Sequence, residues 1–323
     1  MRTRTQLLLA ARSEVAARRQ RAVTLAQEAR RRAGQAIPAL DGAENEARRC
    51  ALEPARLAAC GAAPEEIKAA KEAALKARQA VEDLLRQNGY SPEQLKPRYT
   101  CAQCEDTGRS GGRPCPCVGA LCRALRREEL ARQSALAVSS FESMDAAVYP
   151  DTPDPALGAT VREYMARTLD ALRQYAEQFG PKSTSLLLYG NAGLGKTHAA
   201  LAIAGMVLDK GFDVVYISAQ ELCAGLEKTR FEEEHPLMEA ALEADLLILD
   251  DLGTESLTSY SISCLYTLVN TRMARSAPTI YTTNIVDGAL LEQRYTEKIA
   301  SRLSGSCEPV EFLGEDVRQL LHR

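Results

Sequence analysis

The chain has 323 residues, a length that favours two domains over one. Its 46% hydrophobic and 26% charged residues exclude a wholly disordered or collagen-like chain. Since Trp is absent and the aromatic share is only 5%, stacking platforms are few, and any contact with nucleic acid would have to be mainly electrostatic.

Positive charge is concentrated near the N-terminus. Residues 1–100 hold 19 Lys and Arg against 12 Asp and Glu, a net charge of +7, and the remainder holds 21 against 31, a net charge of −10. Such asymmetry is typical of a basic arm that meets an acidic partner, a phosphate backbone or a membrane surface, and equally of a solvated helical face. The apolar run at residues 7–11 is too short for a signal peptide or a membrane span, so we expect a cytoplasmic protein without a membrane partner.

Three helices are expected in the first hundred residues. Residues 5–36 are rich in Ala, Leu, Arg and Gln and predict one long helix that ends before Pro38. A second helix is predicted from Asp41 to Cys60, and a third from Pro64 to Asn88-Gly89. The third has an apolar stripe at three-to-four spacing, so the helices are expected to pack as an antiparallel bundle. The stripe consists of Ile67, Ala70, Ala74, Ala77, Val81, Leu84 and Leu85.

Four cysteines lie close together after these helices. Two residues separate Cys101 from Cys104, ten separate Cys104 from Cys115, and one separates Cys115 from Cys117. In a chain without a signal peptide, this spacing favours a structural, tetrahedral Zn²⁺ site over disulfides. Unliganded or redox-active thiols are the alternative, and Cys122 could replace one of the ligands.

The composition then changes twice. A basic helix with Arg123, Arg126, Arg127 and Arg132 is expected next, followed by a stretch with three prolines that is typical of a linker. The predicted parts are a helical, partner-binding N-terminal region (1–98), a zinc-binding module with the basic helix (99–138), a linker (139–158) and an α/β domain (159–323).

Short apolar strands alternate with helical segments beyond residue 158. This pattern is typical of a parallel sheet covered by helices on both faces. It predicts an α/β fold with five strands. They are expected at Ser185–Tyr189, Val214–Ser218, Leu246–Asp250, Thr279–Thr283 and Val310–Phe312.

A phosphate-binding loop follows the first of these strands. Residues 190–197 read Gly-Asn-Ala-Gly-Leu-Gly-Lys-Thr and satisfy G-x-x-x-x-G-K-[ST] between an apolar strand and an Ala-rich helix. Glycines there let backbone N–H groups and the helix N-terminus face phosphate oxygens. Lys196 is expected to neutralise the β and γ phosphates of ATP, and the Thr197 hydroxyl to bind Mg²⁺. The predicted nucleotide-binding residues are Gly190, Asn191, Ala192, Gly193, Leu194, Gly195, Lys196, Thr197 and His198.

Polar residues end two later strands. Asp250 is expected to hold Mg²⁺, and Asp251 to orient or deprotonate the attacking water, although both could instead cap a turn. Carboxyl ends of parallel strands gather at one edge, so Asn284 is expected to reach the γ-phosphate or the water, although Asn is also an ordinary turn residue.

The order of motifs resembles the AAA+ ATPases of the DnaC/DnaI helicase-loader and IstB group. Besides the phosphate loop it includes Leu-Ile-Leu-Asp-Asp-Leu-Gly-Thr-Glu (247–255), Thr-Thr-Asn (282–284), Ala-Ser-Arg-Leu (300–303) and the closing Gly-Glu-Asp-Val-Arg (314–318). The resemblance covers residue 141 to the end and implies an AAA+ P-loop NTPase whose five-stranded parallel sheet has the order 5-1-4-3-2.

The same resemblance implies roles for single residues. Asp250 and Asp251 would form the Walker B motif and Asn284 sensor 1. Arg302 would be an arginine finger that completes a neighbouring subunit's site, although a surface arginine is the alternative. Arg318 would be a sensor 2 arginine that binds nucleotide, and Lys298 stands where a second arginine is expected. The implied catalytic residues are Lys196, Asp250, Asp251, Asn284 and Arg302.

Residues 99–108 with the following Cys-x-Cys resemble the zinc-bearing N-terminal domain of DnaI-type loaders. The combined resemblance implies a DNA replication protein with ATP, Mg²⁺ and structural Zn²⁺. It would load the hexameric replicative helicase onto single-stranded DNA and form a homo-oligomer in its ATP state, with hydrolysis that is weak alone and stimulated by assembly or DNA. Two alternatives stay open: an ATP-dependent transposition regulator on duplex DNA, and a protein-interaction adaptor that holds ATP as a structural ligand.

Overall fold

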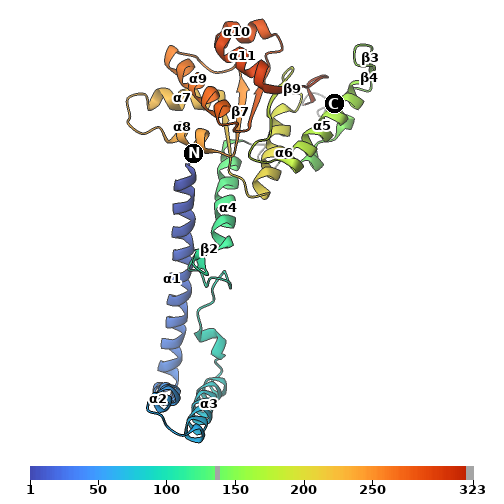
Figure 1. The fold of residues 1–323 in the computed structure, drawn as a ribbon. Helices are drawn as coiled ribbons and strands as arrows, with labels where there is room; N and C mark the ends of the chain where they lie inside the picture. Colours follow the sequence, from blue (N-terminus) through green and yellow to red (C-terminus); the bar gives the residue numbers. More distant parts are fainter. Residues whose placement is uncertain (135–138, 318–323) are drawn as a thin grey trace. The chain divides into compact units, whose positions relative to one another are not determined.

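The computed structural model describes residues 1–134 and 139–317 and divides into two compact units. The core unit consists of Met1–Ala11 and of the chain from Val118 onward, and the N-terminal unit consists of Arg12–Cys117. The division falls within two helices, α1 (Arg4–Ala36) and α4 (Pro116–Gln133) (Figure 1). Within the described ranges, the helices are too short or too polar to cross a membrane.

The N-terminal unit is built mainly from helices. Besides most of α1 it contains α2 (Leu40–Ala59), α3 (Pro64–Gln87), the 3₁₀ turn η1 (Pro92–Leu95), β1 (Arg109–Ser110) and β2 (Arg113–Pro114). Helices α2 and α3 pack side by side as a hairpin, and α1 joins them at its last turns, where Ala33 and Ile37 pack with Leu40 and Leu85. The expected three-helix bundle is therefore wrong along most of α1, because α1 buries Ala22 and other residues outside this cluster.

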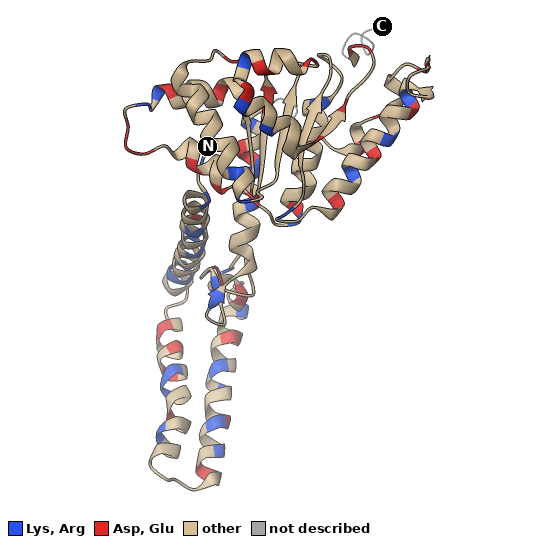
Figure 2. Cartoon of the chain, turned by 45° about the horizontal axis from the view of Figure 1, so that its top comes forward, with Lys and Arg blue, Asp and Glu red and all other residues tan. Residues whose placement is uncertain are grey.

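Charges of both signs cover the hairpin of α2 and α3. Figure 2 shows Lys and Arg interspersed with Asp and Glu along both helices. Several pair within one turn, as Arg56 does with Glu53 at 2.6 Å and Arg78 with Glu82 at 3.3 Å. Exposed pairs of this kind contribute little stability, so much of the N-terminal charge belongs to a solvated helical face.

The core unit contains a five-stranded parallel sheet. Its strands are β5 (Ser185–Tyr189), β6 (Val214–Ser218), β7 (Leu246–Leu252), β8 (Thr279–Thr283) and β9 (Cys307–Glu311). Their spatial order is β6-β7-β8-β5-β9, which confirms both the predicted α/β class and the order 5-1-4-3-2. The prediction of the fifth strand at Val310–Phe312 was wrong in its bounds. Pairing with β5 begins at Cys307. Glu308 and Pro309 do not favour a strand in the sequence, but β9 is an edge strand, and an edge strand tolerates both residues.

Helices cover both faces of the sheet. On one face lie α5 (Val161–Gln178) and α6 (Lys196–Asp209), and on the other α7 (Ala219–Lys228), α8 (Pro236–Glu243), α9 (Ser259–Ala274), α10 (Gly288–Tyr295) and α11 (Glu297–Ser306). Alternate residues of a strand enter the two cores: Leu186 and Leu188 pack on the first face, and Leu187 on the second. This layering brings the carboxyl ends of the strands to one edge.

The segment expected to be a linker, residues 139–158, is part of the core unit. It forms the turns η2 (Phe141–Ser143) and η3 (Ala146–Val148) and the strand β3 (Pro153–Asp154), which pairs with β4 (Ala159–Thr160). Phe141 and Tyr149 are buried in the same core as Leu186 and Leu194. The structure therefore differs from the predicted linker. The prolines and polar residues of this segment indicate an exposed chain, but burial of the two aromatic side chains holds the segment against the core.

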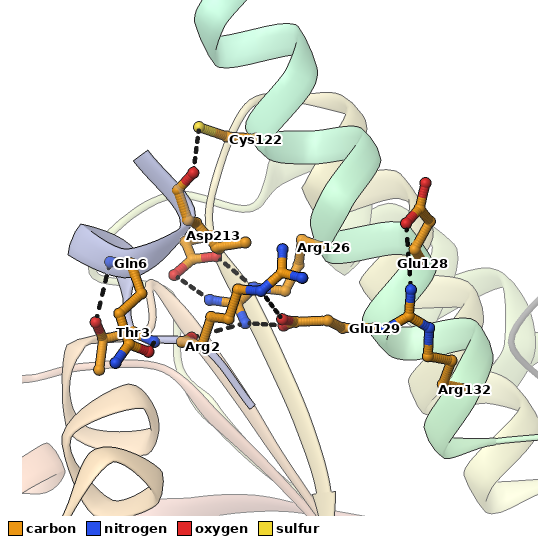
Figure 3. A network of polar contacts seen from close by, with 10 residues as sticks. Arg2, Thr3, Gln6, Cys122, Arg126, Glu128, Glu129, Arg132 and Asp213 are labelled. Carbon is orange, nitrogen blue, oxygen red and sulfur yellow. Dashed lines mark hydrogen bonds and ion pairs between the residues drawn. The ribbon is translucent and has the colours of Figure 1, made fainter. Parts of the chain in front are cut away.

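The basic helix α4 is anchored in the core unit through Arg126 (Figure 3). Arg126 has a side chain that is 1% exposed, and its guanidinium bonds both Asp213 oxygens, at 2.8 and 3.1 Å. It also donates to Glu129 at 2.6 Å and to the backbone carbonyl of Arg2 at 3.0 Å. The basic helix and the first residues of the chain thus belong to the core unit, which differs from the predicted grouping of this helix with the cysteines.

We expect Arg126→Met to lower the free energy of unfolding by about 3–5 kcal/mol, because it leaves the Asp213 carboxylate buried without its cation and leaves Glu129 with only Arg2, at 3.5 Å. Arg127→Met is the matched control on the same helix, since Arg127 pairs with Asp209 at the surface and should contribute less than about 1 kcal/mol. Urea unfolding followed by circular dichroism measures both. Equal shifts for the two variants would contradict the anchoring role.

Candidate functional site

The loop between β5 and α6 has the shape of an anion-binding turn. Gly190, Gly193 and Gly195 take φ values of +140°, +79° and +92°, where other residues are strained. A side chain at Gly190 would also lie 2.2 Å from the carbonyl oxygen of Phe312. Since Lys196 is the first residue of α6, the positive end of that helix opens into the loop.

Lys196 lies buried at the centre of this loop and is 6% exposed. Its Nζ donates to the carbonyl oxygens of Gly190 and Asn191, at 2.8 and 2.6 Å, and to Oδ1 of Asn284 at 2.8 Å. A buried ammonium group held among oxygen acceptors is well placed to neutralise an anionic oxygen. The strand-end Asn284 therefore reaches the phosphate loop.

Asp250, near the end of β7, lies against the first turn of α6. Its Oδ1 accepts from Thr197 Oγ1 at 2.8 Å and from Thr282 Oγ1 at 2.7 Å, and its Oδ2 accepts from the Tyr216 hydroxyl at 2.8 Å. Burial, and then the Asp250 charge, raise the pKa of Tyr216, which therefore stays a donor. Adjacent octahedral ligands of Mg²⁺ lie about 2.9 Å apart, so the oxygens of Thr197 and Asp250 fit that ion.

Asp251 turns away from Asp250 because the strand is irregular at this point. Its φ is +56°, and the pairing of β7 with β8 shifts register between Leu249 and Leu252. The Asp251 carboxylate accepts a hydrogen bond from Asn284 Nδ2 at 3.0 Å. Asn284 thus bridges Lys196 and Asp251, and the two neighbouring acids face different partners.

These residues line a cavity of about 710 Å³ in the core unit. The predicted residues on its wall are Ala192, Gly193, Leu194, Gly195, Lys196, Thr197, His198, Asp250, Asp251 and Asn284. Burial lowers the pKa of His198, whose Nε2 lies 3.2 Å from the Ser143 hydroxyl. The imidazole is therefore mainly neutral at pH 7 and contributes a polar contact rather than a charge.

Sequence reasoning missed the apolar wall of this cavity. Met144, Val148 and Tyr149 come from the segment that was expected to be a linker, and Leu169 comes from α5. The Tyr149 hydroxyl donates to the Leu194 carbonyl at 2.8 Å, and burial raises the pKa of Tyr149 to about 12, so the donor keeps its proton. The apolar residues among the prolines were the available signal. They give the cavity a surface suited to an aromatic base beside the charged loop.

The C-terminal segment also reaches the phosphate loop. Val317 lines the cavity, and its backbone N–H donates to the Gly193 carbonyl at 3.0 Å. A side chain added at Gly193 would lie 1.9 Å from the carboxylate of Asp316. The predicted sensor 2 residue Arg318 lies outside the described residues.

Arg302 lies on α11, apart from the residues that line this cavity. Its Nε donates to Asn270 at 3.1 Å, and its two Nη atoms donate to the Lys298 carbonyl and the Tyr266 hydroxyl, each at 3.0 Å. The guanidinium also lies over the Tyr266 ring, 4.7 Å from the centroid. Arg302 is therefore positioned by its neighbours but does not contact the phosphate loop of its own chain.

Glu255 is a buried residue that stabilises the loop after β7. It is 2% exposed and accepts from the backbone N–H of Gly253 at 2.9 Å and from the hydroxyl of Tyr295. Arg294 donates to the Glu255 carbonyl oxygen. The glutamate of the Asp-Asp-Leu-Gly-x-Glu motif thus connects the Asp251 loop to helix α10, a structural role that the motif alone did not show.

The family model of the IstB-like ATP binding protein matches residues 160–322, about half of the chain. This chain belongs to that family. The IstB-like part contains the phosphate loop, Asp250, Asp251, Asn284 and Arg302, and its sheet has the strand order expected of an AAA+ protein.

Three curated relatives are similar to parts of this IstB-like chain. The replicative helicase loader DnaC of Escherichia coli K12 is 28% identical over 125 residues, which are 38% of this chain and 51% of the relative. DnaI of Bacillus subtilis, also named a replicative helicase loader, is 32% identical over 36% and 37% of the two chains. A putative ATP-binding protein in an insertion sequence of Mycobacterium tuberculosis is 28% identical over 50% and 64%. The chain spans about half the length of the DnaC relative.

The cysteine cluster lies in the N-terminal unit, outside the family match. The Sγ atoms of Cys101, Cys104, Cys115 and Cys117 all lie within 4.8 Å of one another. Two of these separations, Cys101 to Cys115 and Cys104 to Cys117, are 3.7 and 3.6 Å. Disulfide sulfurs lie about 2.0 Å apart, and sulfurs around a tetrahedral Zn²⁺ about 3.8 Å apart. The four thiols therefore fit Zn²⁺.

Cys122 is not part of this cluster. Its Sγ lies 3.8 Å from the backbone carbonyl oxygen of Leu7, a contact within the core unit. The ligand set that the structure supports is therefore the predicted one without Cys122.

We expect the purified protein to contain one Zn²⁺ per chain, because four thiolates at these distances satisfy its tetrahedral preference. Cys104→Ser should lower the zinc content severalfold, whereas Cys60→Ser, at an exposed thiol outside the cluster, should leave it unchanged. Elemental analysis by mass spectrometry measures the metal. Full zinc content in Cys104→Ser would contradict the assignment.

Proposed function

We propose that this protein is an ATPase that loads a replicative DNA helicase onto single-stranded DNA and uses hydrolysis as a switch. The observation that carries the ATPase part is the bridge from Lys196 through Asn284 to Asp251, beside the contact of Thr197 with Asp250. These contacts bring a cation for phosphate, two ligands for a metal and a candidate base to one cavity. That combination is what hydrolysis of a nucleoside triphosphate requires.

Each side chain has one task in this proposal. Lys196 neutralises the β and γ phosphates, and the oxygens of Thr197 and Asp250 hold Mg²⁺, which supplies positive charge to the phosphates when it is bound. Asp251 orients the attacking water and accepts its proton. Asn284 positions the Asp251 carboxylate through its hydrogen bond and also contacts the γ-phosphate. Arg302 of a neighbouring copy supplies the last positive charge, because in its own chain it lies apart from the cavity.

The loader role is supported by the relatives named as helicase loaders. In this proposal the N-terminal unit binds the hexameric helicase, and the ATP-bound core units assemble and bind single-stranded DNA. Hydrolysis is then weak in the single chain and faster after assembly, because the site lacks its neighbour's arginine until that point.

Capture of the purified replicative helicase of the same organism tests the loader role. The full chain, fixed on a column, should retain the helicase. Lys196→Ala should change how capture depends on ATP, while the N-terminal unit that is proposed to bind the helicase stays intact. Transfer of the helicase to a single-stranded circle is the second readout. The loader proposal fails if no complex forms either with ATP or without it.

A second candidate is an ATP-dependent transposition regulator. The insertion-sequence relative favours it, since its similarity covers 50% of this chain, more than either helicase loader. This candidate predicts ATP-dependent filaments on duplex DNA and capture of a transposase. Electron microscopy of the protein with duplex DNA and ATP separates the two, because a loader should form no such filaments.

A further inference from the structure

A groove in the N-terminal unit is lined by arginines from two separate segments. It encloses about 460 Å³ between helix α1 and the turn and hairpin that lie between the second and third cysteines. Arg12, Arg19 and Gln20 line it from α1, and Thr107 and Arg109 line it from the turn and hairpin. We call it the arginine groove. Nothing in the proposed ATPase chemistry uses it.

The positive charge of this groove is available to a ligand. Arg12 and Arg109 are exposed, and neither forms an ion pair with an acid in the part of the chain that the structure describes. Arg19 is fixed in place, because its Nη1 donates to the Glu105 carbonyl at 2.6 Å and its guanidinium lies over the Tyr99 ring, 5.2 Å from the centroid. Two exposed cations without an ion-pair partner in the described residues and one fixed cation therefore face the same space.

The acidic residue on the groove wall does not cancel this charge by pairing with it. Asp106 is 2% exposed, and its two carboxylate oxygens accept the backbone N–H groups of Thr100 and Cys101, at 2.7 and 2.9 Å. Each of its two oxygens thus binds a backbone N–H group, and the two bonds close the turn around the first cysteine. The groove keeps arginines as its exposed charged groups.

We propose that the arginine groove binds the phosphodiester backbone of DNA. Arginine forms two parallel hydrogen bonds to a phosphate, and side chains from both walls can contact successive phosphates of one strand. An acidic protein partner would need apolar anchors, and the groove offers only Val23, Ala16 and Pro114 between its cations. Contacts of this kind are independent of base sequence, as a protein that handles many sites requires.

This inference rests on the proposed function in one respect, namely that the protein works on DNA. It adds a second contact with DNA, in the N-terminal unit, to the contact proposed for the core unit. Because the groove residues lie outside the cavity around Lys196, ATP hydrolysis without DNA should not depend on them.

The test compares the full chain with the double variant Arg12→Gln, Arg109→Gln. Binding of labelled single-stranded and duplex oligonucleotides is measured by fluorescence anisotropy over a series of salt concentrations. We expect about tenfold weaker binding in the variant at low salt, since two charge-assisted contacts are lost. The slope of log K against log salt should decrease by about 1.4 for single strands, because each phosphate contact contributes about 0.7.

Lys68→Gln, Lys71→Gln is the matched control, because it removes the same charge from exposed positions of α3, outside the groove. It should leave the slope unchanged. Arg12→Glu alone is the second variant, since it leaves the cysteine hairpin unchanged and reverses the charge on the α1 wall of the groove, which should also weaken binding. Zinc content and circular dichroism confirm that each variant is folded.

The outcomes separate this inference from the loader proposal. Unchanged DNA affinity and slope in the groove variants would overturn the inference and leave helicase capture unaffected. Lost helicase capture with unchanged DNA binding would also overturn it and assign the groove to a protein partner. Equal losses in the groove and control variants would mean that net charge alone matters, which contradicts a built site.

Discussion

Asp251→Asn is expected to lower the rate of ATP hydrolysis by about 10²–10⁴-fold while ATP still binds. The substitution keeps the size of the side chain but removes the carboxylate that would accept a proton from water. Lys196, Thr197 and Asp250 retain their mutual contacts, so the phosphates and Mg²⁺ keep their ligands. Phosphate release at saturating ATP measures the rate, and the fluorescence of a labelled nucleotide measures binding.

Glu243→Gln is the control for this variant, because Glu243 is an exposed acid that does not line the cavity. Its rate should match that of the unmodified protein. If Asp251→Asn also left turnover unchanged, the protein would not use Asp251 in hydrolysis, and the adaptor with ATP as a structural ligand would become the better reading. If ATP binding were lost instead, Asp251 would be a ligand of the nucleotide rather than a base.

Arg302→Ala is expected to lower the assembled protein's rate of hydrolysis by about 10³–10⁵-fold. The guanidinium is held by Asn270 and Tyr266 and lies apart from its own cavity, so in the proposed mechanism its charge would act on a neighbouring copy. The basal rate of the isolated chain should change little. Arg275→Ala, which removes an exposed arginine at the end of α9, is the matched control.

Mixing the two inactive variants gives a sharper test of this arrangement. A site formed by an Arg302→Ala chain and completed by an Asp251→Asn chain has both an intact Asp251 and an intact Arg302. Hydrolysis should therefore recover partly on mixing, at concentrations where the protein assembles. A mixture as inactive as its components would contradict action between subunits, provided that both variants still assemble.

Much of the nucleotide site could be predicted because its residues follow one another at strand ends. The loop from Gly190 to Thr197, the pair of acids near the end of β7 and Asn284 after β8 each have a local pattern, and a parallel sheet brings such ends to one edge. The structure adds that Asn284 contacts both Lys196 and Asp251, which no spacing in the sequence could show.

Other features could not be predicted because long-range burial decides them. Three prolines and polar neighbours predict a linker at residues 139–158, yet Tyr149 is 3% exposed and bonds the phosphate loop. Arg126 is one of several arginines in a basic helix, and distant partners, Asp213 87 positions later and the Arg2 carbonyl 124 positions earlier, make it a buried anchor. Local composition contains no information about such partners.

By itself, the sequence determined the α/β class, the strand order through its family resemblance, the phosphate loop with its acids, and the four candidate zinc ligands. Each of these depends on residues that are neighbours along the chain or on a repeated local pattern. Only the tertiary structure decided that the first residues and helix α4 belong to the core unit, that the expected linker forms the apolar wall of the cavity, and that arginines from two segments line one groove. These features arise from burial and charge pairing between residues far apart in the chain, and the free energy of those contacts exists only once the chain is folded.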